Sequence, residues 1–137
     1  MKLLVAIVSA WLVANVCKVI STSIRTKVVD WQVVFFAGGM PSVHTTLVTA
    51  LVTSLALSEG LTAVTVASIV FASLFVYDAM TLRRAVAEHN AILRWVHTHL
   101  NVQVAKSLER KGGIGHTPLE VVAGIVIGVL VPLLVYA

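Results

Sequence analysis

The stretch LLVAIVSAWLVANVCKVISTSI, residues 3–24, is 22 residues long and carries a single charge, at Lys18. A helix needs about 20 predominantly apolar residues to cross the hydrocarbon core of a bilayer. The opening MKLLVA resembles a secretory signal peptide, but the apolar run continues to Val16 with no small-residue cleavage site ahead of a soluble domain. We therefore interpret the stretch as a retained transmembrane helix.

The whole chain shares this apolar character. Of its 137 residues, 58% are hydrophobic and 12% are charged, and the mean hydropathy is +0.97. Most residues of a small soluble domain touch water, so such a domain could not hide this much apolar side chain. The composition therefore indicates an integral membrane protein. A single cysteine, Cys17, also excludes an intramolecular disulfide and a Cys-rich metal site.

The predicted fold is all-α, a single polytopic membrane domain over residues 1–137 with about four transmembrane helices. Besides the first stretch, spans are expected at residues 42–58, at 61–80 and from 117 to the end of the chain. Pro41 and Ser42 supply the start of the second span, because serine is a favoured N-cap.

Two other segments are predicted to lie at the membrane surface. Residues 31–37 are apolar but too short to cross, and they lead into Gly38-Gly39-Met40-Pro41. We expect an interfacial or re-entrant segment there, with Trp31 at the headgroup level. Residues 81–111 form the only long hydrophilic stretch, and their apolar residues recur at roughly helical spacing. This pattern predicts an amphipathic helix on the membrane surface.

The distribution of charge predicts the orientation. Four spans place both chain ends on one side of the membrane, and that side holds only Lys2 of the ten Lys and Arg residues. The positive-inside rule makes the basic side cytoplasmic, so we expect a protein of the cell (inner) membrane. A pI near 9.7 beside lipid indicates phospholipid headgroups or a phosphorylated ligand rather than nucleic acid.

Polar residues converge on this cytoplasmic level of the bilayer. Two spans begin there, and a helix start presents unpaired N–H groups and the positive end of a dipole. His44 and His116 stand at these two starts, and Glu120 follows His116 by four residues, on the same helical face. Charged residues at the same level are Lys18, Arg25, Asp78, Arg83 and Arg84. The combination suits a bound phosphate.

In these motifs the sequence resembles the type-2 phosphatidic acid phosphatase and vanadium haloperoxidase superfamily, specifically its small divergent membrane branch. The superfamily pattern is Lys-x6-Arg-Pro, Pro-Ser-Gly-His and Ser-Arg-x5-His-x3-Asp. This chain offers Lys18-x6-Arg25, Pro41-Ser42-Val43-His44 and Arg110-x5-His116-x3-Glu120. The divergent branch is matched more closely by GGMPSVH at 38–44, DAMTLRR at 78–84 and GHTPLEVVAG at 115–124.

The resemblance implies a phosphohistidine mechanism that needs neither metal nor cofactor. His116 would attack phosphorus, Glu120 would hold and polarise its ring, and His44 would protonate the leaving alkoxide. Phosphoryl oxygens would be bound by Lys18, Arg25, Arg110, Arg83 and Arg84, and by the backbone around Ser42 and Val43, with Asp78, Gly39 and Pro41 supporting the site. The substrate would be a lipid phosphate or lipid pyrophosphate of the membrane.

The sequence departs from the family pattern at several positions. Val43 and Glu120 replace Gly and Asp, Thr26 and Glu109 replace Pro and Ser, and Thr81 stands where the divergent branch commonly has Gly. Four spans are also fewer than the usual six helices. Val43 and Glu109 favour a second hypothesis, a non-catalytic lipid-phosphate binder or flippase-like protein with a degenerate site.

Several of these residues also have a purely structural interpretation. Thr117, Pro118 and Glu120 form the pattern of a capping box with proline at the first helical position. Lys18 and Arg25 could extend to headgroups, and Asp78 could pair with an arginine of the following helix.

The small number of helices predicts assembly. Four short helices give little internal surface to bury an acyl chain and a headgroup together. Ala63, Ala67, Gly124 and Gly128 offer close-packing faces, the last two as a Gly-x3-Gly pair. We expect a homo-oligomer whose other partner is its lipid substrate.

Overall fold

The computed structural model describes residues 1–29, 31–35, 39–100 and 116–137. These residues contain no strand and form, in order, α1 (Lys2–Thr26), η1 (Trp31–Phe35), α2 (Val43–Glu59), α3 (Ala63–Met80), α4 (Leu82–Leu100) and α5 (Pro118–Tyr136). The predicted all-α fold is confirmed, and the ends of each expected span agree with a helix to within about two residues.

Hydroxyl side chains begin three of the helices. Ser42, Thr62 and Thr117 are the N-caps of α2, α3 and α5, and each side-chain oxygen accepts a hydrogen bond from the N–H three residues later, at 3.4 Å. Such a cap satisfies one of the N–H groups that a helix start leaves without a partner. Between α2 and α3, Gly60 adopts φ 71°, a conformation that glycine takes without steric cost.

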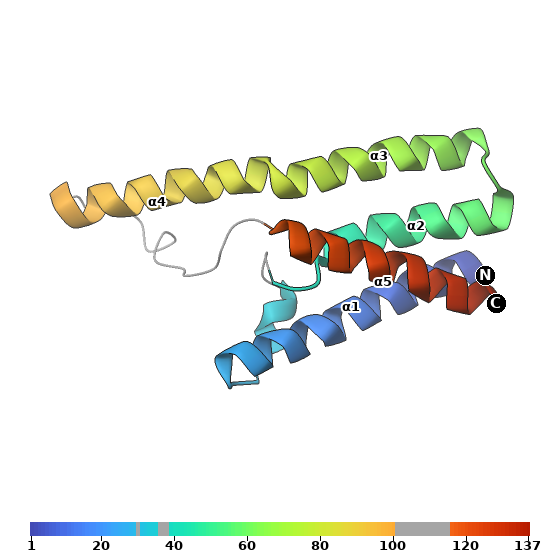
Figure 1. Cartoon of the computed structure of the whole chain (residues 1–137), viewed down its shortest axis with the longest axis horizontal. Helices are drawn as coiled ribbons and strands as arrows, with labels where there is room; N and C mark the ends of the chain where they lie inside the picture. The colour runs from blue at the N-terminus through green and yellow to red at the C-terminus, as the bar shows by residue number, and fades with distance from the viewer. Residues whose placement is uncertain (30, 36–38, 101–115) are drawn as a thin grey trace.

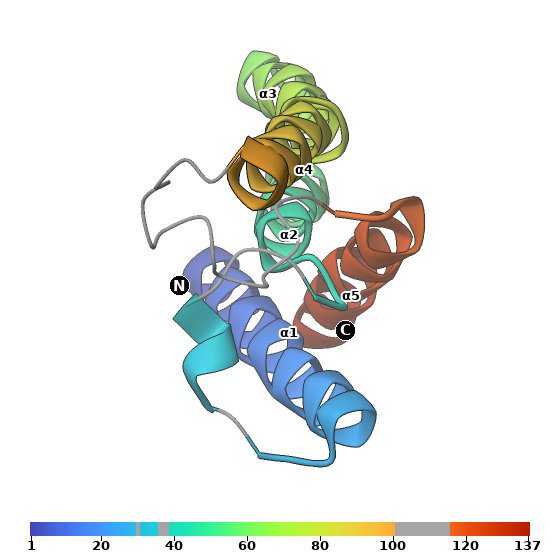
Figure 2. The same ribbon diagram turned by 90° about the vertical axis from the view of Figure 1, so that its left-hand side faces the viewer.

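Helix α2 lies at the centre of the bundle, with α1, α3 and α5 around it (Figures 1 and 2). Its most extensive contact is with α5, which runs in the same direction, whereas α1 and α3 run the opposite way. Both termini lie at one end of the bundle, where Lys2 Nζ is 5.8 Å from the centre of the Tyr136 ring. The other end, which we call the distal end, is formed by the starts of α2 and α5 and the ends of α1 and α3 (Figure 1).

The bundle buries small and hydroxyl-bearing side chains and exposes large apolar ones. Ala10, Ala14, Ala50, Thr46 and Ser54 are fully buried. The exposed large apolar residues include Leu12, Val16, Val70, Phe71, Phe75, Val126 and Leu134. Lipid tails are as apolar as leucine, so membrane helices associate through close packing of small residues rather than by burying large apolar ones. The chain is accordingly an integral membrane protein.

The Gly-x3-Gly pair of α5 is used inside the chain. A Cβ on Gly124 would stand 2.6 Å from the carbonyl oxygen of Ser42, and one on Gly128 would stand 2.7 Å from that of Thr46. The two glycines therefore let the backbones of α5 and α2 approach closely, and they are buried in this contact. The sequence suggests these glycines as a packing face for a second copy of the chain, but α2 already covers them. Ala63 and Ala67, by contrast, are exposed on α3.

Three of the described helices are long and apolar enough to cross a membrane, namely α1, α3 and α5. Helix α2 has 17 residues. At 1.5 Å per residue it is about 26 Å long, at the lower end of the range for a spanning helix. The expected four spans are thus matched approximately, with α2 as the shortest and most enclosed of the four bundle helices.

Helix α4 continues α3 in almost the same direction and extends beyond the distal end of the bundle (Figure 1). Only Thr81 separates the two, and its backbone angles, φ −100° and ψ −62°, stay in the right-handed helical region. Its N–H and its hydroxyl both donate to the Tyr77 carbonyl, at 2.9 and 2.7 Å. A helix is therefore present where the sequence predicts an amphipathic one, with Ile92 and Trp95 among its exposed apolar residues. It continues the direction of α3 instead of turning aside to lie along the membrane surface, as the sequence predicts, because Thr81 keeps the chain helical. The end of the predicted stretch, residues 101–111, lies outside the described part.

The short apolar segment after α1 forms η1, which contacts α1. Trp31 is exposed there, as a side chain at the headgroup level would be. Residues 36–38 of the expected interfacial segment lie outside the described residues.

Candidate functional site

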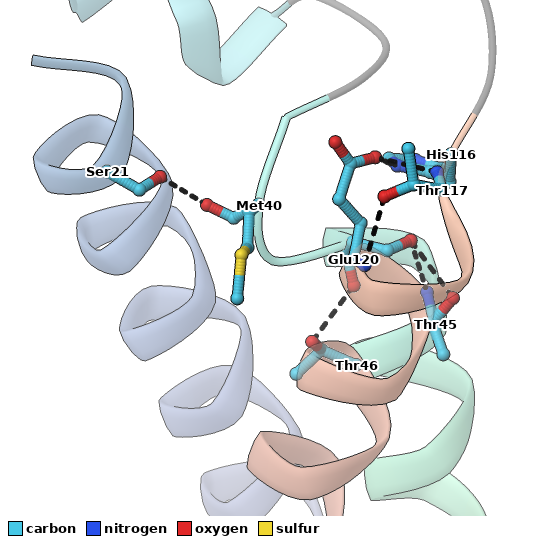
Figure 3. A network of polar contacts seen from close by, with 8 residues as sticks. Ser21, Met40, Thr45, Thr46, His116, Thr117 and Glu120 are labelled. Carbon is cyan, nitrogen blue, oxygen red and sulfur yellow. Dashed lines mark hydrogen bonds and ion pairs between the residues drawn. The ribbon is translucent and has the colours of Figure 1, made fainter. Parts of the chain in front are cut away.

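His116 and Glu120 form a hydrogen-bonded pair where the chain enters α5 (Figure 3). His116 Nδ1 lies 2.9 Å from Glu120 Oε2. Only 3% of the His116 side chain is exposed, against 15% of the Glu120 side chain. The pair is therefore an enclosed imidazole whose carboxylate partner still reaches the surface.

This pairing determines which imidazole nitrogen is available. A carboxylate only accepts hydrogen bonds, so Nδ1 carries the proton and donates it to Oε2. In a neutral imidazole the lone pair then lies on Nε2, on the other side of the ring. An imidazole held in this tautomer is a nucleophile or a base through Nε2.

Thr117 completes a reciprocal cap on the same carboxylate. Its N–H donates to Glu120 Oε2 at 3.2 Å, and its Oγ1 accepts from the Glu120 N–H at 3.4 Å. The capping box of the sequence is therefore present. One oxygen, Oε2, accepts from both the cap and the imidazole, so the structural and the functional interpretations of Glu120 apply together.

Backbone hydrogen bonds tie this pair to two other helix ends. The His116 N–H donates to the carbonyl of Ala79, in the last turn of α3, at 3.4 Å. The Ser42 N–H, at the start of α2, donates to the carbonyl of Glu120 at 2.9 Å. Ala79 and Ser42 are both buried. The pair therefore stands at the junction of three helix ends.

Each polar atom of Ser42 has a partner within the protein. Its N–H donates to Glu120, its Oγ accepts from the N–H and the hydroxyl of Thr45, and its carbonyl accepts from the N–H and the hydroxyl of Thr46. The Ser42 N–H, expected from the sequence to bind phosphate, is thus directed at α5. Val43, the first residue of α2, occupies a position whose N–H no intrahelical bond uses.

His44 lies in the first turn of α2 and is exposed. Thr45, the next residue, has its Cβ 3.1 Å from the position that a Cβ on Gly124 would take. Successive helical residues are rotated by about 100°, so His44 projects from a different side of α2 than the one facing α5. The two histidines share the distal end, where His116 is enclosed beside α3 and His44 is exposed on α2.

Lys18 is buried in α1, with 5% of its surface exposed. Its Cε lies 3.4 Å from the position that a Cβ on Gly39 would take, and Gly39 has φ +92°, which favours glycine. One turn later, the Ser21 hydroxyl donates to the carbonyl of Met40 (Figure 3). The segment leading into α2 is therefore held on α1 beside Lys18, which is more enclosed than a lysine that extends to headgroups.

The remaining predicted residues are distributed over the same end. Arg25 and Asp78 are exposed in the last turns of α1 and α3, and Pro41 is buried beside Ser42. The backbone of α4 carries Arg83 and Arg84, whose side chains lie outside what the structure describes, and Arg110 and Glu109 lie outside the described residues altogether. Within the described part of the chain, no three His, Cys, Asp or Glu side chains are placed to hold a metal ion.

Two contributors to the site escaped the sequence analysis. The carbonyls of Ala79 and Met40 hold His116 and the segment before α2, but a backbone carbonyl acts whatever side chain it carries. No residue pattern could have identified them. The Gly-x3-Gly spacing of Gly124 and Gly128 does indicate close helix packing, but it does not identify the partner helix.

Comparison with known proteins gives two matches. The sequence profile of a family described as the Divergent PAP2 family matches residues 1–131. An uncharacterized membrane protein of Bacillus subtilis (strain 168), YuiD, is 33% identical over 143 residues, which cover 95% of this chain and 90% of that protein. No solved structure matches this chain.

Proposed function

This chain belongs to the Divergent PAP2 family, and on that premise we propose that it is a membrane-embedded phosphatase. Its substrate is a lipid phosphate or a lipid pyrophosphate, and the reaction passes through a phosphohistidine. The single observation that carries the proposal is the 2.9 Å hydrogen bond from His116 Nδ1 to Glu120 Oε2, because it presents Nε2 as a nucleophile.

The first half of the reaction transfers the phosphoryl group to His116. Nε2 forms a bond to phosphorus while the bond from phosphorus to the leaving oxygen breaks. The imidazole becomes cationic in this step, and the Glu120 carboxylate stabilises that charge through Nδ1–H. His44, protonated at the start, gives its proton to the leaving oxygen.

The second half restores the enzyme. A water molecule attacks the phosphohistidine, the bond from nitrogen to phosphorus breaks, and inorganic phosphate leaves. His44 takes the proton of that water and is again protonated for the next turnover. The side chain of His44 is exposed in the first turn of α2, so water has access to it.

The charge of the phosphoryl group is met by several groups at the distal end. The starts of α2 and α5 lie side by side, so the positive ends of two helix dipoles support an anion at one place. Lys18 and the Val43 N–H are the contributors from α1 and α2 in this proposal. The arginines at positions 25, 83, 84 and 110 supply further positive charge.

A second function, lipid-phosphate binding or flippase-like transport without turnover, is favoured by one observation. The Ser42 N–H is donated to Glu120, and the position after it carries a Val43 side chain in place of glycine. A site with one fewer N–H donor would hold phosphate while stabilising the transition state less well.

Two further properties belong to the proposal. The basic distal end faces the cytoplasm of the cell membrane, since nine of the ten Lys and Arg residues lie on that side of the four spans. The protein forms a homo-oligomer through α3, whose outer face exposes Ala63 and Ala67.

Phosphate release from the purified protein in lipid nanodiscs tests the function. A panel of phosphatidic acid, a prenyl phosphate and a prenyl pyrophosphate should yield inorganic phosphate, and His116→Ala should abolish the release. Activity should survive a chelator and be inhibited by vanadate, which mimics five-coordinate phosphorus. Binding of these lipids without phosphate release or a trapped phosphohistidine would establish the binding function instead.

A further inference from the structure

Thr117 makes two hydrogen bonds with Glu120, one with its carboxylate and one with its backbone N–H. The Thr117 N–H contacts the carboxylate at Oε2, and the Thr117 hydroxyl contacts the Glu120 backbone N–H. His116 contacts the same Oε2. The carboxylate oxygen that orients the imidazole is therefore also the one that the cap holds.

An ordinary capping box does not need a particular oxygen. Either oxygen of a glutamate at the third helical position satisfies the N–H of the N-cap residue, and the carboxylate is free to rotate between them. In this chain Oε2 accepts two hydrogen bonds from consecutive residues, His116 and Thr117. The hydroxyl of Thr117 fixes the turn from which the Glu120 side chain departs, since it accepts from the N–H of that residue.

We propose that Thr117 is a positioning residue for the reaction of His116. It does not touch the substrate. By fixing the turn at Glu120 it fixes Oε2, and through Oε2 it fixes the direction of the Nε2 lone pair. This inference rests on the proposed phosphatase function, although the orientation of the imidazole is a property of the resting protein that is measured without substrate.

The chain contains a matched control for the loss of a cap. Thr62 is the N-cap of α3, and its Oγ1 accepts from the Thr65 N–H at 3.4 Å, the same distance as at Thr117. Thr62 lies at the opposite end of the bundle from His116. Thr62→Ala and Thr117→Ala thus each remove one hydroxyl cap from a helix of this bundle, but only the second acts beside the imidazole.

The kinetic experiment uses the full chain in nanodiscs with the panel lipid that gives the highest rate. A displacement of about 1 Å in a reacting group costs up to roughly a hundredfold in rate. We expect Thr117→Ala to lower kcat by about ten- to a hundredfold with KM nearly unchanged. Thr117→Ser, which keeps the hydroxyl, should recover most of the loss, and Thr62→Ala should keep the wild-type kcat. An unchanged kcat in Thr117→Ala, or an equal loss in Thr62→Ala, overturns the proposal.

The second readout needs no turnover. Nitrogen NMR of protein labelled at histidine reports the tautomer of His116, identified as the signal lost in His116→Gln. Wild type, Thr117→Ser and Thr62→Ala should show a ring protonated at Nδ1. In Thr117→Ala the chemical shifts of the two ring nitrogens should average, because the ring exchanges between tautomers. A fixed Nδ1–H in Thr117→Ala overturns the positioning role. Absence of phosphate release in wild type would instead refute the proposed function, so the two failures are distinguishable.

Discussion

The backbone N–H of Ser42 donates to the backbone carbonyl of Glu120 at 2.9 Å. This bond joins the starts of two parallel helices, α2 and α5, near His44 in the first turn of α2 and His116 just before α5. Two glycines of α5 make the approach possible, because a side chain at either position would collide with an α2 carbonyl. The relative placement of His44 and His116 therefore depends on backbone contacts.

Replacing Glu120 with glutamine separates capping from catalysis. Glutamine serves at this position of a capping box nearly as well as glutamate, so stability should remain close to wild type. The charge that supports a cationic imidazole is lost, so turnover should fall by roughly a hundredfold or more. Thermal unfolding and phosphate release, measured on one preparation, check this. Near-normal turnover in Glu120→Gln would mean that Glu120 is only a cap.

The role of His44 as general acid predicts a dependence on the leaving group. His44→Ala should lower the rate of a lipid phosphomonoester, whose alkoxide leaves poorly, by about 10²–10⁴-fold. The rate with a lipid pyrophosphate should fall considerably less, because its phosphate leaving group needs less protonation. The ratio of the two rates in wild type and variant is the measurement. Equal losses for both substrates would contradict the assignment and would indicate that His44 binds phosphate instead.

The close contact between α5 and α2 predicts that Gly124→Ala is destabilising. The added Cβ would stand 2.6 Å from the Ser42 carbonyl, which already accepts from Thr46. Overpacking of this kind costs about 1–3 kcal/mol, and more where the obstacle is backbone. Unfolding in mild detergent should show the loss.

Gly128→Ala and Ala67→Val serve as comparisons for that variant. Gly128 meets α2 as closely as Gly124 does, but one turn further from the site, whereas Ala67 is exposed on α3. We expect Gly128→Ala to be destabilised similarly and Ala67→Val to resemble wild type. If Gly124→Ala were as stable as wild type, α5 and α2 would be further apart than the 2.6 Å from the added Cβ to the Ser42 carbonyl oxygen implies.

The straight junction at Thr81 predicts where Trp95 lies. Fourteen residues of helix separate the two positions, about 21 Å at 1.5 Å per residue, so Trp95 should stand well beyond the hydrocarbon core. In a variant with Trp11→Phe and Trp31→Phe, iodide in the water should quench Trp95 fluorescence and brominated lipid tails should not. A variant that retains only Trp11, exposed on the spanning helix α1, should show the opposite. Quenching of Trp95 by brominated lipid would place α4 flat on the membrane.

The spanning helices were predictable from their apolar lengths and from local signals at several of their ends. Ser42 and Thr117 mark two starts, Gly60 marks a turn, and the apolar lengths match a bilayer. The straight path from α3 into α4 was not predictable, because it depends on whether one residue, Thr81, leaves the helical region of backbone space. The residues next to Thr81 in the sequence do not determine whether it stays in the helical region.

The site was predictable as a set of residues but not as an arrangement. The sequence predicts the contact of His116 with Glu120 from their four-residue spacing on a helix, and the contact is present. The reason differs, because His116 precedes the N-cap Thr117 and Glu120 reaches back to it across the capping box. The destination of the Ser42 N–H was not predictable, because it depends on how closely α5 approaches α2. Gly-x3-Gly indicates a close approach to some helix, and a sequence does not say whether that helix belongs to the same chain.

The two termini meet at the end of the bundle that carries none of this chemistry, with Lys2 against the ring of Tyr136. A fluorescent protein fused to either terminus would therefore stand across the membrane from His116 and leave the distal end unobstructed. The same proximity makes the chain suitable for circular permutation. A short linker joining the old ends, with new ends opened after α4, would leave α1, α2, α3 and α5 in place. It would also move a fused reporter to the opposite side of the bilayer.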